Sequence, residues 1–267
     1  MQIQETAAQR YERLLSLDHR ITKACFTPFM GEFGWYIMTH TKRVHAFNAD
    51  QKIAFIKRGH EALFPSINEF IYDWDDIPDS HKAGVVNNPN INDVLSKIRI
   101  EATIIYHTDI SWPEKQSLAH ICFTPRHNIN HNLKVDVVLA PRKRTIDAFR
   151  NLGSDAWQSI ANWLVSNGLS VGVVGNSNTT HYIGGNVIRS SDYIDVDTDI
   201  ELINSAKCII CQESGMLYLA AMCKKPVFII DWCHREIFDL HRDKNVFFRI
   251  TNPSVVANEA ISFCRST

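Results

Sequence analysis

The stretch CQESGMLYLAAMCKKPVFIID, residues 211–231, joins apolar segments through a short polar step. GMLYLAAMC (215–223) is typical of a buried helix, and PVFIID (226–231) is typical of a buried strand. KCIICQ (207–212) precedes them and has the β-branched residues of another strand. A plain core segment does not need the polar residues Glu-Ser-Gly at 213–215. The order strand, polar step, helix, strand predicts a parallel α/β sheet with a functional junction.

Such junctions bind ligands, because the carboxyl ends of parallel strands and the free N–H groups of the following helices converge there. Ser214 is expected to cap the helix, and Gly215 lets the backbone approach a ligand closely. The helix dipole and free amides suit an anion such as phosphate. The alternative interpretation is a tight turn whose glycine only lets helix and strand pack together.

The rest of the chain also alternates strands and helices, as a parallel α/β protein does. Short apolar runs that predict strands occupy residues 23–29, 52–57, 69–74, 101–107, 118–124, 135–141, 169–175, 207–212 and 226–231. Helical patterns occupy residues 1–20, 35–47, 154–168 (with Ser154 as its cap), 198–206, 215–223 and 254–265. The polar, aperiodic PRHNINHNL (125–133) indicates a linker. We therefore expect two domains, residues 1–133 and 134–267.

Composition excludes several classes of protein. A length of 267 residues with 45% hydrophobic content is enough for two ordinary cores. Lys and Arg total 28 against 29 for Asp and Glu, so no global field attracts nucleic acid or a membrane surface. No segment approaches the roughly 20 apolar residues that span a bilayer, and ETAAQRYERLL (5–15) lacks the apolar core of a signal peptide. We expect a cytoplasmic protein without a membrane span.

The seven cysteines are odd in number and scattered, which indicates reduced core residues. Cys208 and Cys211 form a C-x-x-C pattern, but residues three apart on a strand point to opposite faces. Burial in a strand is therefore favoured over a redox or zinc role for this pair.

The opening stretch, with DIELINSAKCII (199–210) before it, resembles the C-terminal domain of GT-B glycosyltransferases, most closely the heptosyltransferase-like family 9. That family has an acidic residue, Ser, Gly, two variable positions, His, Leu, Ala, Ala, a turn and a Pro-led strand. The matching residues here are Glu213, Ser214, Gly215, Met216, Leu217, Tyr218, Leu219, Ala220, Ala221 and Pro226. Tyr218 replaces the customary His, and Glu213 replaces the more usual Asp. The resemblance implies an α/β fold of the GT-B type, with two Rossmann-like parallel-sheet domains facing a cleft.

A second match follows the first strand of the same half. VVLAPRKRTIDAFRN (137–151) looks like the family's basic loop, which grips the donor diphosphate. The resemblance therefore implies donor-binding roles for Arg142 and Arg144 beside the junction residues 213–215, because guanidinium groups pair bidentately with phosphate oxygens. The alternative is a solvated turn. Second-rank candidates of this half are Lys143, Arg150, Gly175 and Asn176 below the nucleoside, Tyr218, His234 and Arg235.

In the N-terminal half, FTPFMGEFGWYIM (26–38) is similar to the family's opening Gly-Asp loop, whose acidic residue is the general base. The resemblance assigns this role to Glu32, with Gly31 and Gly34 as second-rank neighbours. A sugar hydroxyl is a poor nucleophile, so a carboxylate must accept its proton as it attacks the anomeric carbon. The alternative for Glu32 is a carboxylate that favours the start of a helix. Residues 76–134 match no part of the family, and the acceptor site is expected to vary there.

The implied function is sugar transfer from a nucleotide-sugar donor to an acceptor hydroxyl, with UDP expected from its general frequency in such enzymes. The acceptor is a saccharide, glycan or small molecule, and a hydroxymethylated DNA base is possible if basic residues such as Lys42, Arg43, Lys57 and Arg58 form a rim. The alternatives are a nucleotide-sugar epimerase and a non-catalytic nucleotide- or glycan-binding module. An epimerase needs acid and base groups around the donor sugar, for which Glu32, Glu213 and His234 are the candidates.

No cofactor and no divalent metal are expected. The D-x-D pattern occurs at 73–75, 195–197 and 197–199, which shows how readily it arises by chance. A site with basic residues does not need a metal to hold a diphosphate, and Asp73 and Asp75 are interpreted as solvated acidic turns. His127 and His131 lie in an Asn-rich loop, so a metal site there is also disfavoured.

Overall fold

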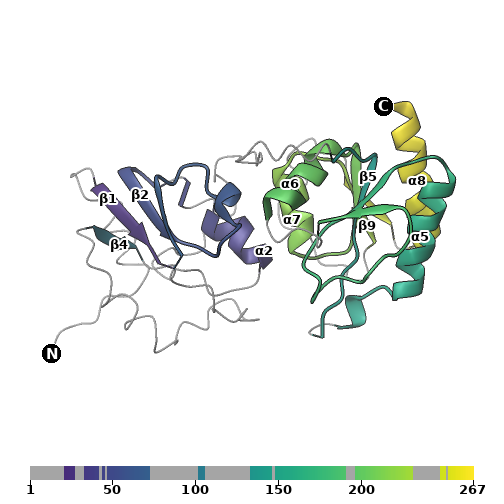
Figure 1. Ribbon diagram of the computed structural model, residues 1–267, viewed down its shortest axis with the longest axis horizontal. Coiled ribbons are helices and arrows are strands. Elements are labelled where there is room, and N and C mark those ends of the chain that lie inside the picture. Colours follow the sequence, from purple (N-terminus) through teal and green to yellow (C-terminus); the bar gives the residue numbers. More distant parts are fainter. Residues whose placement is uncertain are drawn as a thin grey trace. The chain divides into compact units, whose positions relative to one another are not determined.

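The computed structural model describes residues 21–27, 33–41, 44–45, 47–72, 102–105, 133–145, 148–190, 196–230, 247–250 and 252–267. The chain divides into two compact units, Met1–Ile121 and Cys122–Thr267. Each unit contains one parallel β-sheet with helices, so the predicted α/β class is confirmed (Figure 1). The boundary predicted at 133/134 follows residues 106–132, which lie outside the described part.

The sheet of the first unit has the order β3-β2-β1-β4 with every pair parallel. Its strands are β1 (Ile21–Phe26), β2 (Ala49–Phe55), β3 (Glu69–Ile71) and β4 (Thr103–Ile105). These are the apolar runs that the sequence predicts at 23–29, 52–57, 69–74 and 101–107. Alternate residues of the two central strands, Cys25, Ile53 and Phe55, are buried together on one face. Burial, and then the charge of Glu69, raise the pKa of the Cys25 thiol to about 11, although the charge of Lys23 opposes this.

The helix predicted at 35–47 has a different shape in the structure. It begins as α2 (Phe33–Trp35), continues as the π-helical segment η1 (Tyr36–Thr41), and a further helical turn includes residues 44–45. The Tyr36 and His40 rings stack within the π segment, with centroids 5.7 Å apart. Lys52 of β2 donates to the carbonyl oxygens of Val44 and His45, at 2.9 and 2.8 Å. The 3-10 turn η2 (Glu61–Leu63) lies between β2 and β3.

The sheet of the second unit has six parallel strands in the order β10-β9-β8-β5-β6-β7. They are β5 (Val137–Ala140), β6 (Val171–Val173), β7 (Val187–Arg189), β8 (Cys208–Cys211), β9 (Val227–Ile230) and β10 (Phe247–Ile250). Numbered from the start of the unit, this is the doubly wound order 3-2-1-4-5-6. The strand order reverses between β5 and β8, which is where such sheets bind ligands.

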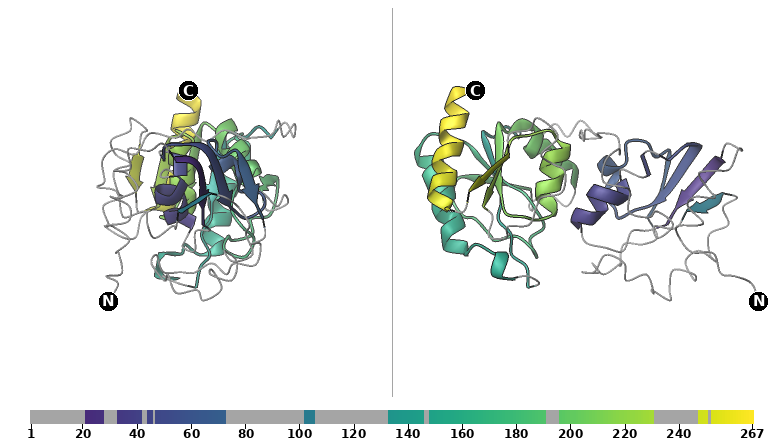
Figure 2. Two further views of the ribbon diagram at one scale, coloured as in Figure 1. Left: turned by 90° about the vertical axis from the view of Figure 1, so that its left-hand side faces the viewer. Right: turned by 180° about the vertical axis from the view of Figure 1, so that it is seen from behind.

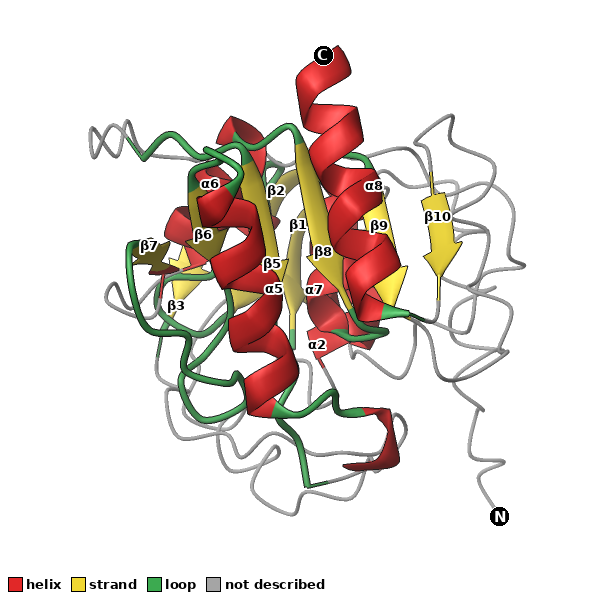
Figure 3. Cartoon of the chain, turned by 90° about the vertical axis from the view of Figure 1, so that its right-hand side faces the viewer, coloured by secondary structure: helices red, strands yellow, loops and turns green. Residues whose placement is uncertain are grey.

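Helices cover both faces of this sheet (Figure 3). They are α5 (Ser154–Ser166), α6 (Val196–Ser205), α7 (Gly215–Met222) and α8 (Pro253–Ser266), and the 3-10 turn η3 (Ala148–Arg150) precedes α5. α5 and α8 lie side by side on one face, and α6 and α7 cover the other (Figures 1 and 2). The α5–α8 face contains fully buried Trp157 among aliphatic residues from strands and helices. The N-cap of α5 is Gly153, so the predicted cap role of Ser154 is wrong.

The cysteines described in the structure are buried and unbridged. Cys208 belongs to the core cluster under α5 and α8, whereas Cys211, three residues on, is buried outside it, as strand alternation predicts. The Cys208 and Cys264 sulfur atoms lie 3.7 Å apart. Cys208 and Cys211 therefore do not share one face as a redox or metal pair would.

Candidate functional site

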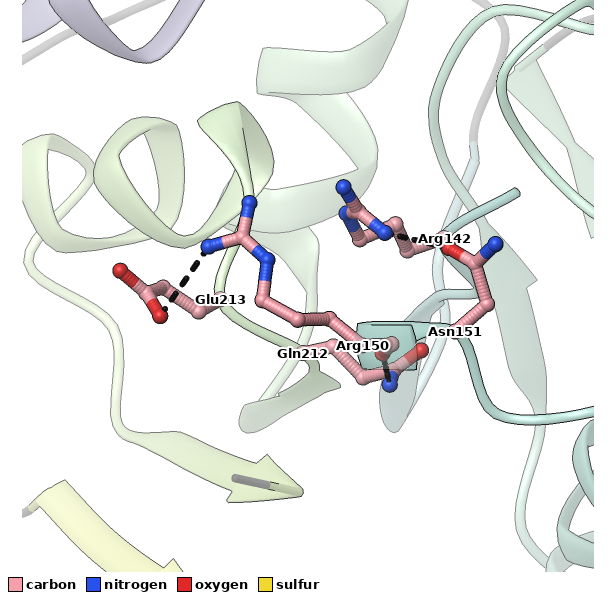
Figure 4. Close-up of polar contacts among 5 residues, drawn as sticks. All are labelled: Arg142, Arg150, Asn151, Gln212 and Glu213. Atoms are coloured by element: carbon pink, nitrogen blue, oxygen red, sulfur yellow. Dashed lines mark hydrogen bonds and ion pairs between the residues drawn. The ribbon is translucent and has the colours of Figure 1, made fainter. Parts of the chain in front are cut away.

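The reversal of strand order places the candidate site beyond the carboxyl ends of β5 and β8 (Figure 4). After β5 the chain runs through residues 141–152, which include the basic loop and η3. After β8 it passes through Gln212, Glu213 and Ser214 into α7. The two segments that the sequence singles out thus meet at one edge of the sheet.

Arg142 is the buried cation of the basic loop, with only 4% of its surface exposed. Its Nη1 donates to the side-chain oxygen of Asn151. Lys143, the next residue, is exposed, and its backbone N–H donates to the carbonyl oxygen of Thr179 at 2.7 Å. The loop is therefore attached to the segment after β6, with Arg142 pointing inward and Lys143 facing solvent.

Asn151 and Gln212 hold this loop in place, and the sequence does not single them out (Figure 4). The Asn151 amide nitrogen donates to the carbonyl oxygen of Arg144 at 2.7 Å, and its oxygen accepts from the Arg144 N–H at 3.2 Å. Gln212 is 1% exposed, donates to the carbonyl oxygen of Arg150 and accepts from Leu152 N–H at 3.1 Å. The only signal in the sequence is a polar residue at the end of a buried strand.

Arg150 and Glu213 form an ion pair, with Nη1 and Oε2 3.2 Å apart. Their side chains are only 14% and 16% exposed. In Figure 4 the Arg150 side chain extends toward Glu213, and Arg142 extends toward Asn151. The structure therefore brings a second-rank candidate, Arg150, into contact with a first-rank one, Glu213.

The N-terminus of α7 completes this part of the site. Ser214 is the N-cap residue of α7, as the sequence predicts, but its hydroxyl makes no capping hydrogen bond among the described residues. Its extended backbone (φ −160°, ψ 174°) instead lets the Ser214 carbonyl oxygen accept from Leu217 N–H at 3.1 Å. Within the described part of the chain, the buried Ser214 hydroxyl has no hydrogen-bond partner. Gly215 is the first helical residue.

The segment after β6 lies beside the basic loop. Gly175 has φ +111°, and its N–H donates to the carboxylate of Asp199 at 3.1 Å. Ser190 also donates to that carboxylate. Asn176 is exposed, and its side chain accepts from Asn178 N–H at 2.8 Å, which stabilises a local turn. Asp199, to which the sequence assigns no role of its own, thus positions the end of β6.

His181 follows this turn, and its N–H donates to the carbonyl oxygen of Pro141 at 2.8 Å. Burial, and then the charge of Lys143, lower the pKa of its imidazole, although a hydrogen bond with the Leu152 backbone opposes this. His181 is therefore neutral near pH 7, and the charge beside the basic loop comes from its lysine and arginines.

Of the remaining predicted residues, some belong to described helices and several lie outside the described part of the chain. Tyr218 is 7% exposed within α7, and Gly34 is buried in α2 of the first unit. Gly31, Glu32, His234 and Arg235 lie outside the described residues, as do Lys42, Arg43, Asp73, Asp75, Asp195, His127 and His131. Their roles stay predictions.

The acidic residues in the first turn of α6 are buried, with Asp197 3% and Asp199 8% exposed. Over the described ranges, no group of three or more His, Cys, Asp or Glu side chains has the arrangement of a metal site. Nor does any helix in the described part of the chain have the length and apolar character needed to cross a bilayer.

Solved structures resemble this chain, although no family model and no curated protein matches it. A family 9 glycosyl transferase from Veillonella parvula matches with TM-score 0.59 and 10% identity, over 93% of this chain and 99% of that chain. The E. coli ADP-heptose LPS heptosyltransferase II matches with TM-score 0.62 and 11% identity, over 92% and 99%. An E. coli heptosyltransferase with ADP matches with TM-score 0.54 and 9% identity, over 91% and 99%.

At these identities the likeness concerns the fold. Two units, each with a parallel sheet and helices, correspond to the GT-B fold of these structures, so the predicted fold class is confirmed. Arg142, Arg150 and Glu213 of the second unit lie where a doubly wound sheet binds its ligand.

Proposed function

We propose that this protein is a GT-B glycosyltransferase that moves a sugar from a nucleotide-sugar donor to an acceptor hydroxyl. The observation that carries the proposal is the cluster of Arg142, Arg150 and the α7 N-terminus at the switch point of the second sheet. A leaving diphosphate gains negative charge in the transition state, and guanidinium groups and helix amides stabilise it. The fold likeness to three sugar transferases supports the same activity.

The identity of the donor nucleotide is proposed on separate grounds. UDP is expected only from its general frequency among such enzymes. One similar E. coli structure is named for ADP-heptose, and another contains ADP. We therefore place an ADP-sugar first and a UDP-sugar second among the donors to be tested.

On the acceptor side, the family resemblance assigns the role of general base to Glu32. Its carboxylate would accept the proton of the attacking hydroxyl. A glycan or other saccharide is the first acceptor class to test. A hydroxymethylated DNA base is the second acceptor class to test, and only the sequence argument favours it.

We also propose that transfer needs no divalent metal and no cofactor. Arg142 and Arg150 supply positive charge at the donor diphosphate position, which is the task a metal performs in other transferases. Donor turnover in excess EDTA, compared with turnover in Mg²⁺, tests this directly. Equal rates support the proposal, and a rate restored only by the metal contradicts it.

The central experiment incubates the full chain with ADP- and UDP-sugars and follows the products by chromatography. Slow release of nucleoside diphosphate, accelerated by an acceptor, supports a transferase. An isomerised donor identifies an epimerase, and binding without turnover identifies a non-catalytic module.

The same assay tests the base. We expect Glu32→Gln to lower turnover by about 100-fold or more while donor affinity stays within a few-fold, because the carboxylate acts on the acceptor. Glu259→Gln on α8 removes the same charge at an exposed position and serves as the control. Full activity in Glu32→Gln would show that another group takes the proton.

A further inference from the structure

Glu213 and Arg150 neutralise each other at the position assigned to the donor diphosphate. The pair is 3.2 Å apart and mostly shielded from solvent, with 14% and 16% of the two side chains exposed. A guanidinium that is to bind phosphate through Nη1 must first release this carboxylate. The ion pair is therefore part of the energetics of binding in this site, which rests on the proposed function.

The backbone of Arg150 is held separately from its side chain. Gln212 donates to the Arg150 carbonyl oxygen and accepts from Leu152 N–H at 3.1 Å. Adjacent residues at the end of β8 thus contact the two parts of Arg150: Gln212 fixes the main chain, and Glu213 pairs with the guanidinium. The side chain can change its partner while η3 stays in place.

Diphosphate is a better partner for this guanidinium than one carboxylate. It carries several negative charges and accepts the two parallel hydrogen bonds that an arginine fork donates. Arg142, held by Asn151 on the same loop, adds a second cation that favours the diphosphate. In contrast, the single carboxylate of Glu213, 3.2 Å away, provides only one negative charge.

We propose that Glu213 is a resident counter-anion that occupies the Arg150 guanidinium until the donor diphosphate displaces it. Arg150 is then a diphosphate-binding residue of the donor site, and Glu213 competes with the ligand for it. Once displaced, the Glu213 carboxylate is available as an acceptor for donor hydroxyl groups. The residue therefore opposes binding of the diphosphate and favours binding of the sugar nucleotide's hydroxyls.

Binding of ligands with and without hydroxyl groups tests this competition. We expect Glu213→Gln to bind inorganic pyrophosphate about three- to tenfold more tightly than the unchanged chain, as measured by calorimetry. Arg150→Gln should bind it more weakly, and Glu213→Gln should have no further effect in the Arg150→Gln background. Nucleotide-sugar turnover by Glu213→Gln should fall, because a neutral amide oxygen is a weaker acceptor for donor hydroxyls than the carboxylate.

Charge-matched controls are Glu259→Gln and Arg265→Gln, exposed residues of α8 that change net charge equally. Thermal melts of each variant check the fold. Unchanged or weaker pyrophosphate binding in a folded Glu213→Gln chain overturns the proposal, as does the absence of binding in both chains. Failure of the proposed function is a separate result: no nucleotide sugar is turned over, although Glu213→Gln still tightens pyrophosphate binding.

Discussion

At the scale of single residues, Gly175 shows why the end of β6 accepts one residue type. Its φ of +111° is strained for any residue with a Cβ, and a Cβ there would lie 2.5 Å from the Thr180 hydroxyl oxygen. We expect Gly175→Ala to lower the free energy of unfolding by about 2–4 kcal/mol, since strain and overlap act together. Urea denaturation followed by circular dichroism measures the change.

Substitutions at two other glycines, which are adjacent in the chain, separate the cost of backbone strain from the cost of steric overlap. Gly185 has φ +88° with open space around a Cβ, so Gly185→Ala should cost about 1–2 kcal/mol from backbone strain alone. At Gly184 a Cβ makes ordinary contacts of 3.7 Å or more, so Gly184→Ala should change stability by about 0.5 kcal/mol at most. A cost for Gly175→Ala no larger than that for Gly185→Ala would contradict the overlap with Thr180.

The individual residues of the candidate site differ in how well the sequence predicts them. Arg142, Arg144 and Glu213 lie at the strand ends expected from the motif, because a motif fixes local order along the chain. Asn151 was missed although its partners Arg142 and Arg144 are at most nine positions away, because an asparagine in a polar loop has no distinctive pattern. Gln212 was missed because its contacts join residues about 60 positions apart and depend on the pairing of β5 with β8. No local pattern encodes such a contact, whereas doubly wound topology creates it.

At the scale of elements, the two lysines before β9 stabilise the C-terminal ends of two different helices, α7 and α6. The backbone of Lys224 has φ 56° and donates to Ala221 O at 2.9 Å, and Lys225 N–H donates to Ala220 O at 3.2 Å, which together close α7 as a Schellman motif. The Lys225 ammonium donates to Asn204 O and Ala206 O at the end of α6, at 2.6 and 2.9 Å.

We therefore expect Lys225→Met to destabilise the chain by about 1–2 kcal/mol, because it leaves carbonyl groups of the α6 terminus without their charged donor. Lys224→Met is the matched control, since that side chain is exposed and the backbone φ is unchanged for another L-residue. Urea midpoints of the two variants give the comparison. Equal midpoints would mean that solvent replaces the Lys225 hydrogen bonds without loss.

Elements with long apolar runs are the ones that the sequence predicts well. β5, β8 and β9 are buried on both faces and coincide with their predicted runs to within about two residues. β7 (Val187–Arg189) was missed because it is a short edge strand, half-buried throughout, with too few residues to show a period. β10 was also missed, although Phe247–Ile250 contains the aromatic and β-branched residues of a strand.

At the scale of the whole molecule, sequence order predicts the class but not the sheet order. Alternating strands and helices indicate parallel sheets, and a right-handed crossover rule permits several arrangements. The order 3-2-1-4-5-6 in the second unit is set by long-range packing of α5 and α8 on one face and α6 and α7 on the other. This order, rather than any single motif, brings the basic loop to the α7 N-terminus.

The stability of the second unit at low pH depends in part on a carboxylate that lies just before β5. Asp136, before β5, accepts from Ser170 N–H at 2.9 Å and from its hydroxyl at 2.7 Å, before β6. Desolvation raises the pKa of Asp136, but the Ser170 hydrogen bonds and the Lys207 charge outweigh it and leave the pKa below its ordinary value. The folded state therefore favours the carboxylate, and this stabilisation is complete above the ordinary pKa of about 4 and is lost as pH falls through the folded-state pKa.

Asp136→Asn should thus lower the urea midpoint at pH 7, and its difference from the unchanged chain should shrink toward pH 3. Because Asp136 is partly exposed, the effect is expected to be modest and to weaken further at high salt. Ser170→Ala, which removes the hydroxyl donor but keeps the carboxylate, should show a smaller loss with the same pH trend. Urea midpoints at pH 7, 5 and 3 provide the measurement. A difference that grows as pH falls would mean that the folded state favours the protonated acid, contrary to the geometry of the Ser170 donors.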